Sequence, residues 1–168
     1  MEPLRIGVLG AARISDKAII EPARNTGHRL VVVAARDRNR AEKFAQDGNI
    51  ERVVDSYQEV IDDPEVEAIY NPLPNGLHGP WNLRAIAAGK HVLSEKPSAS
   101  NAAEARDVRD AVNASGVKFM EAFHYRYHPV MKRMLELASS GELGELTNID
   151  LHMSFPNTDA TDPDWDAD

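Results

Sequence analysis

A short turn near the start of the chain has residue types that can bind phosphate. The turn reads Gly10, Ala11, Ala12, Arg13, Ile14 and Ser15. It lies between an apolar run and a segment of helical spacing, where a dinucleotide-binding fingerprint is found. Gly10 permits a tight turn, the backbone at Ala12 can approach a pyrophosphate, and the helix start offers N–H groups and the positive dipole end. The candidate cofactor-binding positions here are Gly10, Ala12, Arg13, Ile14 and Ser15.

This fingerprint is incomplete, because Ala12 and Ser15 stand where two of its three glycines are expected. A strand, turn and helix that bind no ligand would show much the same residues. The turn therefore indicates a dinucleotide site only together with other segments.

The end of the predicted second strand carries residues that select between NAD and NADP. An acidic residue there accepts the ribose 2′-hydroxyl of NAD, whereas an arginine accommodates the NADP phosphate. Here Ala35 is followed by Arg36, Asp37 and Arg38. Because Arg36 and Arg38 could form charge-assisted hydrogen bonds to that phosphate, we expect NADP to be preferred, with NAD as the alternative. Asp37 would reach the ribose after a small backbone shift, and both arginines could instead be solvated residues at a helix start.

Six apolar runs alternate with helical patterns and would position these turns. The predicted strands are Leu4–Leu9, Leu30–Ala35, Arg52–Val54, Val66–Tyr70, His91–Ser94 and Val117–Glu121. The predicted helices are Arg13–Thr26, Asn39–Asp47, a helix capped by Ser56, Gly79–Ala88, and Ala102–Ser115 capped by Ser100. Such alternation is typical of an α/β fold with a Rossmann-type, doubly wound parallel sheet.

The pattern changes after Pro129, and we expect a second domain to begin. Apolar residues from Val130 to Leu137 have the spacing of an amphipathic helix, whose stripe we interpret as core packing. Residues Leu146–Phe155 alternate like the first strand of another sheet. We therefore divide the chain into a dinucleotide-binding domain, 1–123, and the start of a second, C-terminal domain, 124–168.

The composition excludes several classes of function. The net charge of −8 argues against nucleic-acid binding, and the 168 residues contain no cysteine for a disulfide, thiolate metal site or cysteine nucleophile. The six histidines lack close metal-ligand spacing, so we predict no metal. Apolar runs are too short for a membrane span and the N-terminus does not resemble a signal peptide, so we expect a cytoplasmic protein that does not contact membranes.

Four further segments show a resemblance to a known family. They are Tyr70 to Asn75 with His78, Gly89 to Pro97, Glu121 to Pro129, and Gly141 to Gly144. In this order they resemble the glucose-fructose oxidoreductase, inositol dehydrogenase and MocA (Gfo/Idh/MocA) family, over essentially the whole chain. The sequence is most similar to the branch of dihydrodiol dehydrogenases and NADP-linked xylose dehydrogenases. The resemblance implies an oxidoreductase that transfers a hydride between a nicotinamide cofactor and a sugar, polyol or diol.

The resemblance also implies roles for individual residues. Lys96 matches the catalytic lysine of the family, Pro97 is expected to follow a cis peptide bond, and Glu95 would orient the nicotinamide. An ammonium at the reacting oxygen stabilises developing negative charge and can relay a proton. The other positions that match cofactor-binding residues are Leu73, Asn75, His78 and Arg126. Without the resemblance, a lysine at a strand end is usually a surface residue, and His78 would be a polar cap or core histidine.

Relatives continue into a larger sheet that completes the substrate site and often forms the oligomer interface. The resemblance thus implies that residues 124–168 are the incomplete start of a C-terminal α+β substrate and oligomerisation domain, whose missing sheet could form a homo-oligomer. We expect the 168 residues alone to bind cofactor with little turnover. Trp165 is a doubtful match to an aromatic residue near the nicotinamide. The alternative interpretation is a non-catalytic dinucleotide-binding module or sensor that needs a partner chain to cover an exposed edge.

Overall fold

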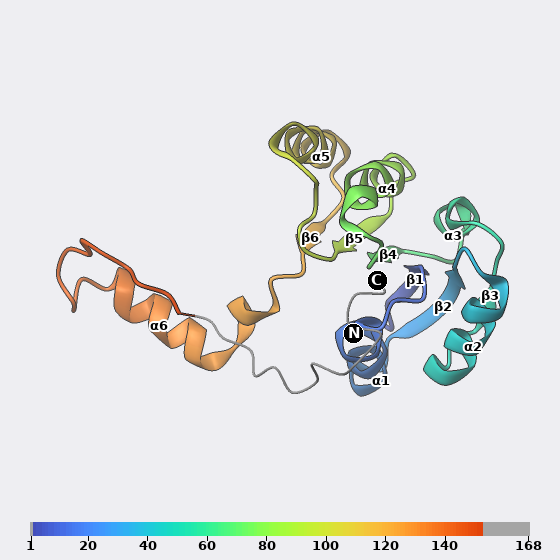
Figure 1. Ribbon diagram of the computed structural model, residues 1–168, viewed down its shortest axis with the longest axis horizontal. Helices are drawn as coiled ribbons and strands as arrows, with labels where there is room; N and C mark the ends of the chain where they lie inside the picture. Colours follow the sequence, from blue (N-terminus) through green and yellow to red (C-terminus); the bar gives the residue numbers. More distant parts are fainter. Residues whose placement is uncertain (1, 153–168) are drawn as a thin grey trace, which may run out of the picture. The chain divides into compact units, whose positions relative to one another are not determined.

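The computed structural model describes residues 2–152, and their centre is a six-stranded parallel sheet. The strand order is β3-β2-β1-β4-β5-β6, with helices between the strands (Figure 1). This order reverses direction between β1 and β4, as in doubly wound nucleotide-binding folds. The predicted Rossmann-type α/β fold is confirmed.

The elements follow the predicted alternation, with most boundaries shifted by one to three residues. The strands are β1 Arg5–Leu9, β2 Arg29–Ala34, β3 Arg52–Val53, β4 Ala68–Asn71, β5 His91–Ser94 and β6 Phe119–Glu121. The helices are η1 Asp16–Ile20, α1 Glu21–Thr26, α2 Arg38–Gly48, α3 Tyr57–Asp62, α4 Asn75–Ala87, α5 Ala102–Ser115, η2 His124–Tyr127 and α6 Pro129–Ser139. The helix predicted from Arg13 thus begins at Asp16 with a π-helical segment, η1.

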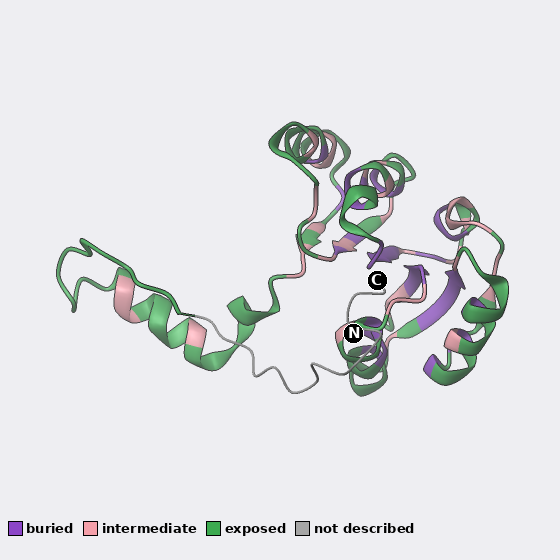
Figure 2. Cartoon of the chain, viewed as in Figure 1, coloured by how far each residue is buried: buried purple, intermediate pink, exposed green. Residues whose placement is uncertain are grey.

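Two apolar layers cover the two faces of the sheet. One layer packs α3, α4 and α5 against the strands, with Ile61, Ile86 and Val108 among its buried residues. The other packs η1, α1 and α2 on the opposite face, with Ile20 and Ala45 buried. Figure 2 shows the central strands largely buried and the outer helix surfaces exposed. Because a parallel sheet is covered on both faces, its strands read as continuous apolar runs.

Helix starts follow local capping chemistry, with two corrections to the prediction. Ser56 accepts a hydrogen bond from the Glu59 amide at 3.2 Å, as a capping residue should. Helix α5 is capped by Asn101, not Ser100, since the Asn101 side chain accepts the amides of both Ala103 and Glu104. Helix α4 begins at Asn75, four residues before its predicted start at Gly79.

The contacts within the chain divide it into two compact units, Met1–Ala122 and Phe123–Asp168. In the second unit α6 forms as predicted, but its apolar stripe is not core: Val130, Met134 and Leu135 are 60%, 53% and 52% exposed. The described residues of this unit provide no second apolar layer to cover them. Residues 146–152 form no strand, because a strand needs a hydrogen-bonded neighbour. The rest of that predicted strand, and Trp165, lie outside the described residues.

Candidate functional site

The carboxyl-terminal edge of the sheet collects nearly all of the predicted site residues. All strands are parallel, so the loops after β1, β2, β4 and β5 leave the sheet at this same edge. These loops, together with the starts of α2 and α4, carry residues 10–15, 36–38, 73–78 and 95–96 respectively. In open α/β sheets ligands bind at this edge, where the strand order reverses.

The turn after β1 has a backbone conformation that lets a ligand approach the main chain closely. Gly10 is buried with φ +91°, a conformation that side chains rarely allow, and its amide donates to the Ala34 carbonyl at 2.7 Å. A Cβ at Gly10 would lie 3.1 Å from Leu73 Cδ2. Leu73 therefore packs against this turn, while Ala12 is half-buried and Ile14 is 51% exposed.

Ser15 ends this turn with a buried hydroxyl. Ser15 is fully buried, and its Oγ has no hydrogen-bond partner within residues 2–152. A buried polar atom without a partner is uncommon and favours a bound polar group or water. The tight turn at Gly10 fits the close approach of a phosphate-bearing cofactor.

The three arginines after β2 are not equivalent. Arg38 forms ion pairs with Glu42 and Asp55, and these raise the pKa of its guanidinium. Arg40, which the sequence analysis did not single out, donates to the Ala11 carbonyl of the glycine turn at 2.8 Å. The Arg36 side chain forms no hydrogen bond or ion pair with any described residue.

The carboxylate of Asp37 is engaged at the start of α2. It accepts a hydrogen bond from the Arg40 amide at 3.0 Å and so caps the helix. The Arg36 backbone contacts the Tyr57 hydroxyl, which lies beside the glycine turn. Burial raises the pKa of the Tyr57 hydroxyl, and the two arginine charges offset part of that rise. The same hydroxyl is 4.0 Å from the position of a Cβ at Gly10.

The segment after β5 presents Lys96 at the same edge. The Glu95 amide donates to the Asn71 carbonyl at 2.9 Å and so continues the pairing of β5 with β4. Lys96 is exposed, and the bond from Lys96 to Pro97 is cis, which confirms the expected isomer. The Glu95 side chain accepts a hydrogen bond from the Tyr70 hydroxyl at 3.0 Å and lies 3.4 Å from the Lys96 amide.

A buried amide network, formed by Asn71, Asn82 and Ser94, lies beneath this segment. The fully buried Asn82 of α4 donates to Ser94 Oγ at 2.9 Å and to the Ser98 carbonyl at 3.0 Å. Its Oδ1 accepts a hydrogen bond from Asn71 Nδ2 at 2.8 Å. One side chain therefore binds the chain on both sides of residues 95–97. Sequence reasoning did not identify Asn82.

His78 also contacts this segment. It is buried in α4, and its Nδ1 lies 2.5 Å from the Pro97 carbonyl. Its Nε2 is buried and has no hydrogen-bond partner in the described part of the chain. Asn75 is exposed at the first position of α4, and its carbonyl accepts from Ser100 Oγ at 3.3 Å.

One predicted site residue belongs to the other unit. Arg126 is exposed in η2, where its amide donates to the Phe123 carbonyl at 3.1 Å. Its role at the nucleotide site therefore stays a prediction.

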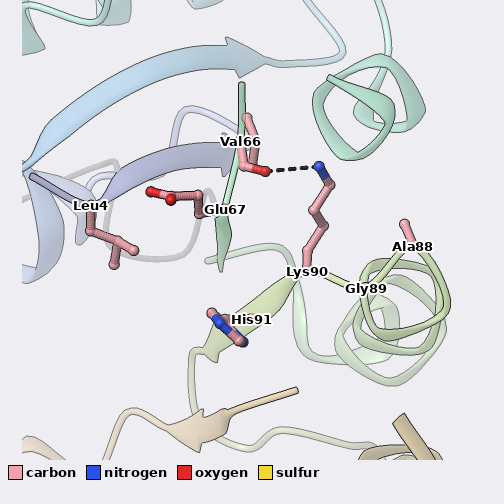
Figure 3. Close-up of a pocket in the computed structure, with 7 residues that line it drawn as sticks. All are labelled: Leu4, Val66, Glu67, Ala88, Gly89, Lys90 and His91. Atoms are coloured by element: carbon pink, nitrogen blue, oxygen red, sulfur yellow. Dashed lines mark hydrogen bonds between the residues drawn. The ribbon is translucent and has the colours of Figure 1, made fainter. Parts of the chain in front are cut away.

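A separate hollow of about 320 Å³ lies at the opposite, amino-terminal edge of the strands, between the starts of β4 and β5 (Figure 3). Its polar side chains are engaged by protein groups. The Lys90 ammonium donates to the carbonyls of Asp63 and Val66, and Glu67 pairs with Arg5. This hollow is structural and is not the candidate site. Among residues 2–152, no group of three or more His, Asp or Glu could hold a metal ion, and no helix is long and apolar enough to cross a membrane.

Known proteins are similar to this chain both in sequence and in fold. Residues 4–123 match the model of an oxidoreductase family with an NAD-binding Rossmann fold, GFO_IDH_MocA. The chain is 38% identical over 159 residues to D-xylose 1-dehydrogenase (NADP(+)) 2 of Haloferax volcanii. The aligned residues are 95% of this chain and 49% of that protein. It is 40% identical over 145 residues to trans-1,2-dihydrobenzene-1,2-diol dehydrogenase of Mus musculus, covering 85% of this chain and 44% of that protein.

The fold agrees with solved structures as well. The 3-ketoreductase KijD10 of Actinomadura kijaniata, solved with NADP and TDP-benzene, matches with a TM-score of 0.76 and 30% identity over 83% of this chain and 43% of that one. A levoglucosan dehydrogenase, solved with NADH and levoglucosan, matches with a TM-score of 0.80 and 25% identity over 86% of this chain and 41% of that one.

The fold, and the loops that gather at the carboxyl-terminal edge of its sheet, define a dinucleotide-binding Rossmann domain. The chain belongs to the Gfo/Idh/MocA oxidoreductase family, and residues 4–123 are its NAD(P)-binding domain. The chain spans about half the length of the curated relatives it matches.

Proposed function

We propose that this chain is the nucleotide-binding part of an oxidoreductase that transfers a hydride between NADP(H) and a sugar, polyol or diol. The observation that carries this proposal is the convergence of four loops on one sheet edge, with the Gly10 turn and Lys96 at that same edge. Relatives named as a xylose dehydrogenase and a diol dehydrogenase support a CH–OH group as the site of reaction.

The arginines support NADP over NAD. The backbone of Arg36 contacts Tyr57 beside the glycine turn, and its side chain has no hydrogen-bond or ion-pair partner among the described residues, so its guanidinium is available to a 2′-phosphate. Asp37, the carboxylate that could have bound a ribose hydroxyl, instead caps α2. The Arg38 guanidinium is already paired with the carboxylates of Glu42 and Asp55. We therefore assign the main contact with the 2′-phosphate to Arg36 and a supporting contact to Arg38. Arg40 joins this region to the glycine turn through Ala11.

Lys96 is proposed as the catalytic residue. Bound NADP(H) supplies or accepts the hydride at the nicotinamide. The exposed ammonium of Lys96 would contact the reacting oxygen, stabilise negative charge on it and relay its proton. Glu95, which is held by Tyr70, would orient the nicotinamide. The buried amide network keeps residues 94–98 in one conformation, which is the preorganisation that such electrostatic stabilisation requires.

A hydride-transfer assay tests this function. The protein is purified from its natural source and mixed with NADPH or NADP⁺ and a panel of aldoses, polyols and diols, while the absorbance of NADPH is followed. We expect turnover with at least one of these compounds, and faster turnover with NADP(H) than with NAD(H). Tight cofactor binding without turnover on any of them would contradict the enzyme assignment and favour a non-catalytic dinucleotide-binding module.

A further inference from the structure

Tyr70 is a buried side chain with a polar end at the candidate site. It lies in β4, its fractional exposure is 0%, and its ring packs in the apolar layer that includes Ile6, Val8 and Ile19. A smaller apolar residue could fill such a layer, whereas a buried tyrosine hydroxyl requires a hydrogen-bond partner. The partner here is Glu95 Oε1, at 3.0 Å.

The phenol lies between two loops of the nucleotide site. On one side is Glu95, which follows β5 and precedes Lys96. On the other side is Ser15, the last residue of the turn after β1. The Ser15 hydroxyl lies near enough to the Tyr70 phenol to lower the pKa of that phenol. Tyr70 thus connects the phosphate-binding turn with the segment that carries Lys96.

The chemistry of Tyr70 makes it a permanent donor. Burial raises the pKa of its phenol, the charge and hydrogen bond of Glu95 raise it further, and Ser15 offsets part of the rise. The O–H is therefore intact across the physiological pH range. A permanent donor keeps Glu95 Oε1 in one place, while Glu95 Oε2 lies 3.4 Å from the Lys96 amide. The carboxylate is held at both oxygens, and the stronger contact is from Tyr70.

We propose that Tyr70 is a positioning residue that holds the Glu95 carboxylate for the nicotinamide half of the cofactor. This inference rests on the proposed function, because it assumes that a nicotinamide dinucleotide binds at this edge. It goes beyond that function by assigning a role to a core residue that acts on the nicotinamide end of the site through Glu95. Tyr70 acts on one end of the cofactor, because Glu95 follows β5 whereas the arginines that bind the adenosine end follow β2.

Two ligands separate this role from a purely structural one. NADP⁺ contains the nicotinamide, and 2′-phospho-ADP-ribose lacks it but keeps the adenosine, the 2′-phosphate and the pyrophosphate. Each is titrated by calorimetry into the 168-residue chain and into Tyr70→Phe, which removes a single oxygen. We expect Tyr70→Phe to weaken NADP⁺ about tenfold, the scale of losing one hydrogen bond to a charged group, and to change 2′-phospho-ADP-ribose by less than about twofold.

A double-mutant comparison provides the control. Glu95→Ala should show the same selective loss, and adding Tyr70→Phe to it should have no further effect, because the tyrosine acts through that carboxylate. Circular dichroism establishes that each variant is folded. If Tyr70→Phe does not fold, Glu95→Ala alone decides, since unchanged NADP⁺ affinity in that variant overturns the proposal.

The outcomes distinguish this inference from the function on which it rests. Equal weakening of both ligands by Tyr70→Phe, or no weakening of either, overturns the positioning role while leaving dinucleotide binding intact. Failure of the unaltered chain to bind either ligand contradicts the proposed function itself, and the positioning role with it.

Discussion

Replacing Asn82 with leucine should destabilise the domain by removing the centre of the buried amide network. Leucine has nearly the shape of asparagine, so little cavity forms and the effect is mainly that of lost hydrogen bonds. Three bonds disappear, at 2.8, 2.9 and 3.0 Å. Each contributes about 0.5–1.5 kcal/mol, and partners left unsatisfied in the interior add to the cost. Ser94 and Asn71 each keep one longer contact, at 3.2 and 3.4 Å, so we expect a total loss of about 3 kcal/mol.

The assay for Asn82→Leu is urea unfolding followed by circular dichroism. A loss of about 3 kcal/mol should lower the midpoint by about 1–2 M urea at a slope typical of a small domain. The matched control is Asn113→Leu, an exposed position on α5, which should change stability by less than about 0.5 kcal/mol. The reasoning is refuted if Asn82→Leu loses less than about 1 kcal/mol or behaves like the control.

Three further predictions concern the cofactor, the chemistry and the response to pH. Arg36→Asp should reverse the cofactor preference, lowering NADPH affinity at least about tenfold while NADH binding is kept or improved, as measured by calorimetry; equal affinities in the unaltered protein would contradict it. Lys96→Ala should lower turnover by roughly 100-fold or more with little change in cofactor binding, and unchanged turnover would remove Lys96 from the mechanism. Arg52 pairs with Asp63 at 2.7 Å and lowers the pKa of that carboxyl, so the pair stabilises the fold above the ordinary pKa of 3.8, and this stabilisation is lost as the pH falls through the lowered value. Arg52→Met should therefore be less stable than the unaltered protein at neutral pH and approach it in acid; a difference in unfolding free energy that persists at about pH 2 would contradict this.

The sheet and its functional edge could be predicted because their signals are local. Strands buried on both faces read as apolar runs, and parallel strands separated by helices place every following loop at the same edge. The Gly10 turn could therefore be placed at that edge from its own residues, whereas Lys96 was assigned to the site only through the family resemblance. The exact ends of the helices could not be predicted in the same way. Asn101 and Ser100 have equally good capping chemistry, and only the backbone conformation decides which of them caps α5.

The contacts that organise the site were beyond sequence reasoning. Asn82 lies 11 to 16 positions from its three partners, and an asparagine within a helix gives no signal of what it will meet. Arg36, Arg38 and Arg40 occupy every second position, so the sequence does not distinguish them. Only the folded structure shows that Arg38 forms an ion pair with Asp55 and that Arg40 donates a hydrogen bond to the Ala11 carbonyl. The apolar stripe of α6 predicted core packing, but its residues are exposed in the described part of the chain, because periodicity does not say which segment would cover a helix face.

Calorimetric titration of NADPH into the 168-residue chain, beside Gly10→Val, tests the central claim most directly. Valine at Gly10 would need a φ of +91° and would place its Cβ 3.1 Å from Leu73 Cδ2, so the turn could not keep its shape. We predict saturable binding of one NADPH per chain, about tenfold tighter than NADH, and loss of this binding in Gly10→Val while the circular dichroism spectrum stays that of a folded α/β protein. Absence of NADPH and NADH binding by the unaltered chain, or equal binding by the variant, would contradict the assignment of this edge as the nucleotide site.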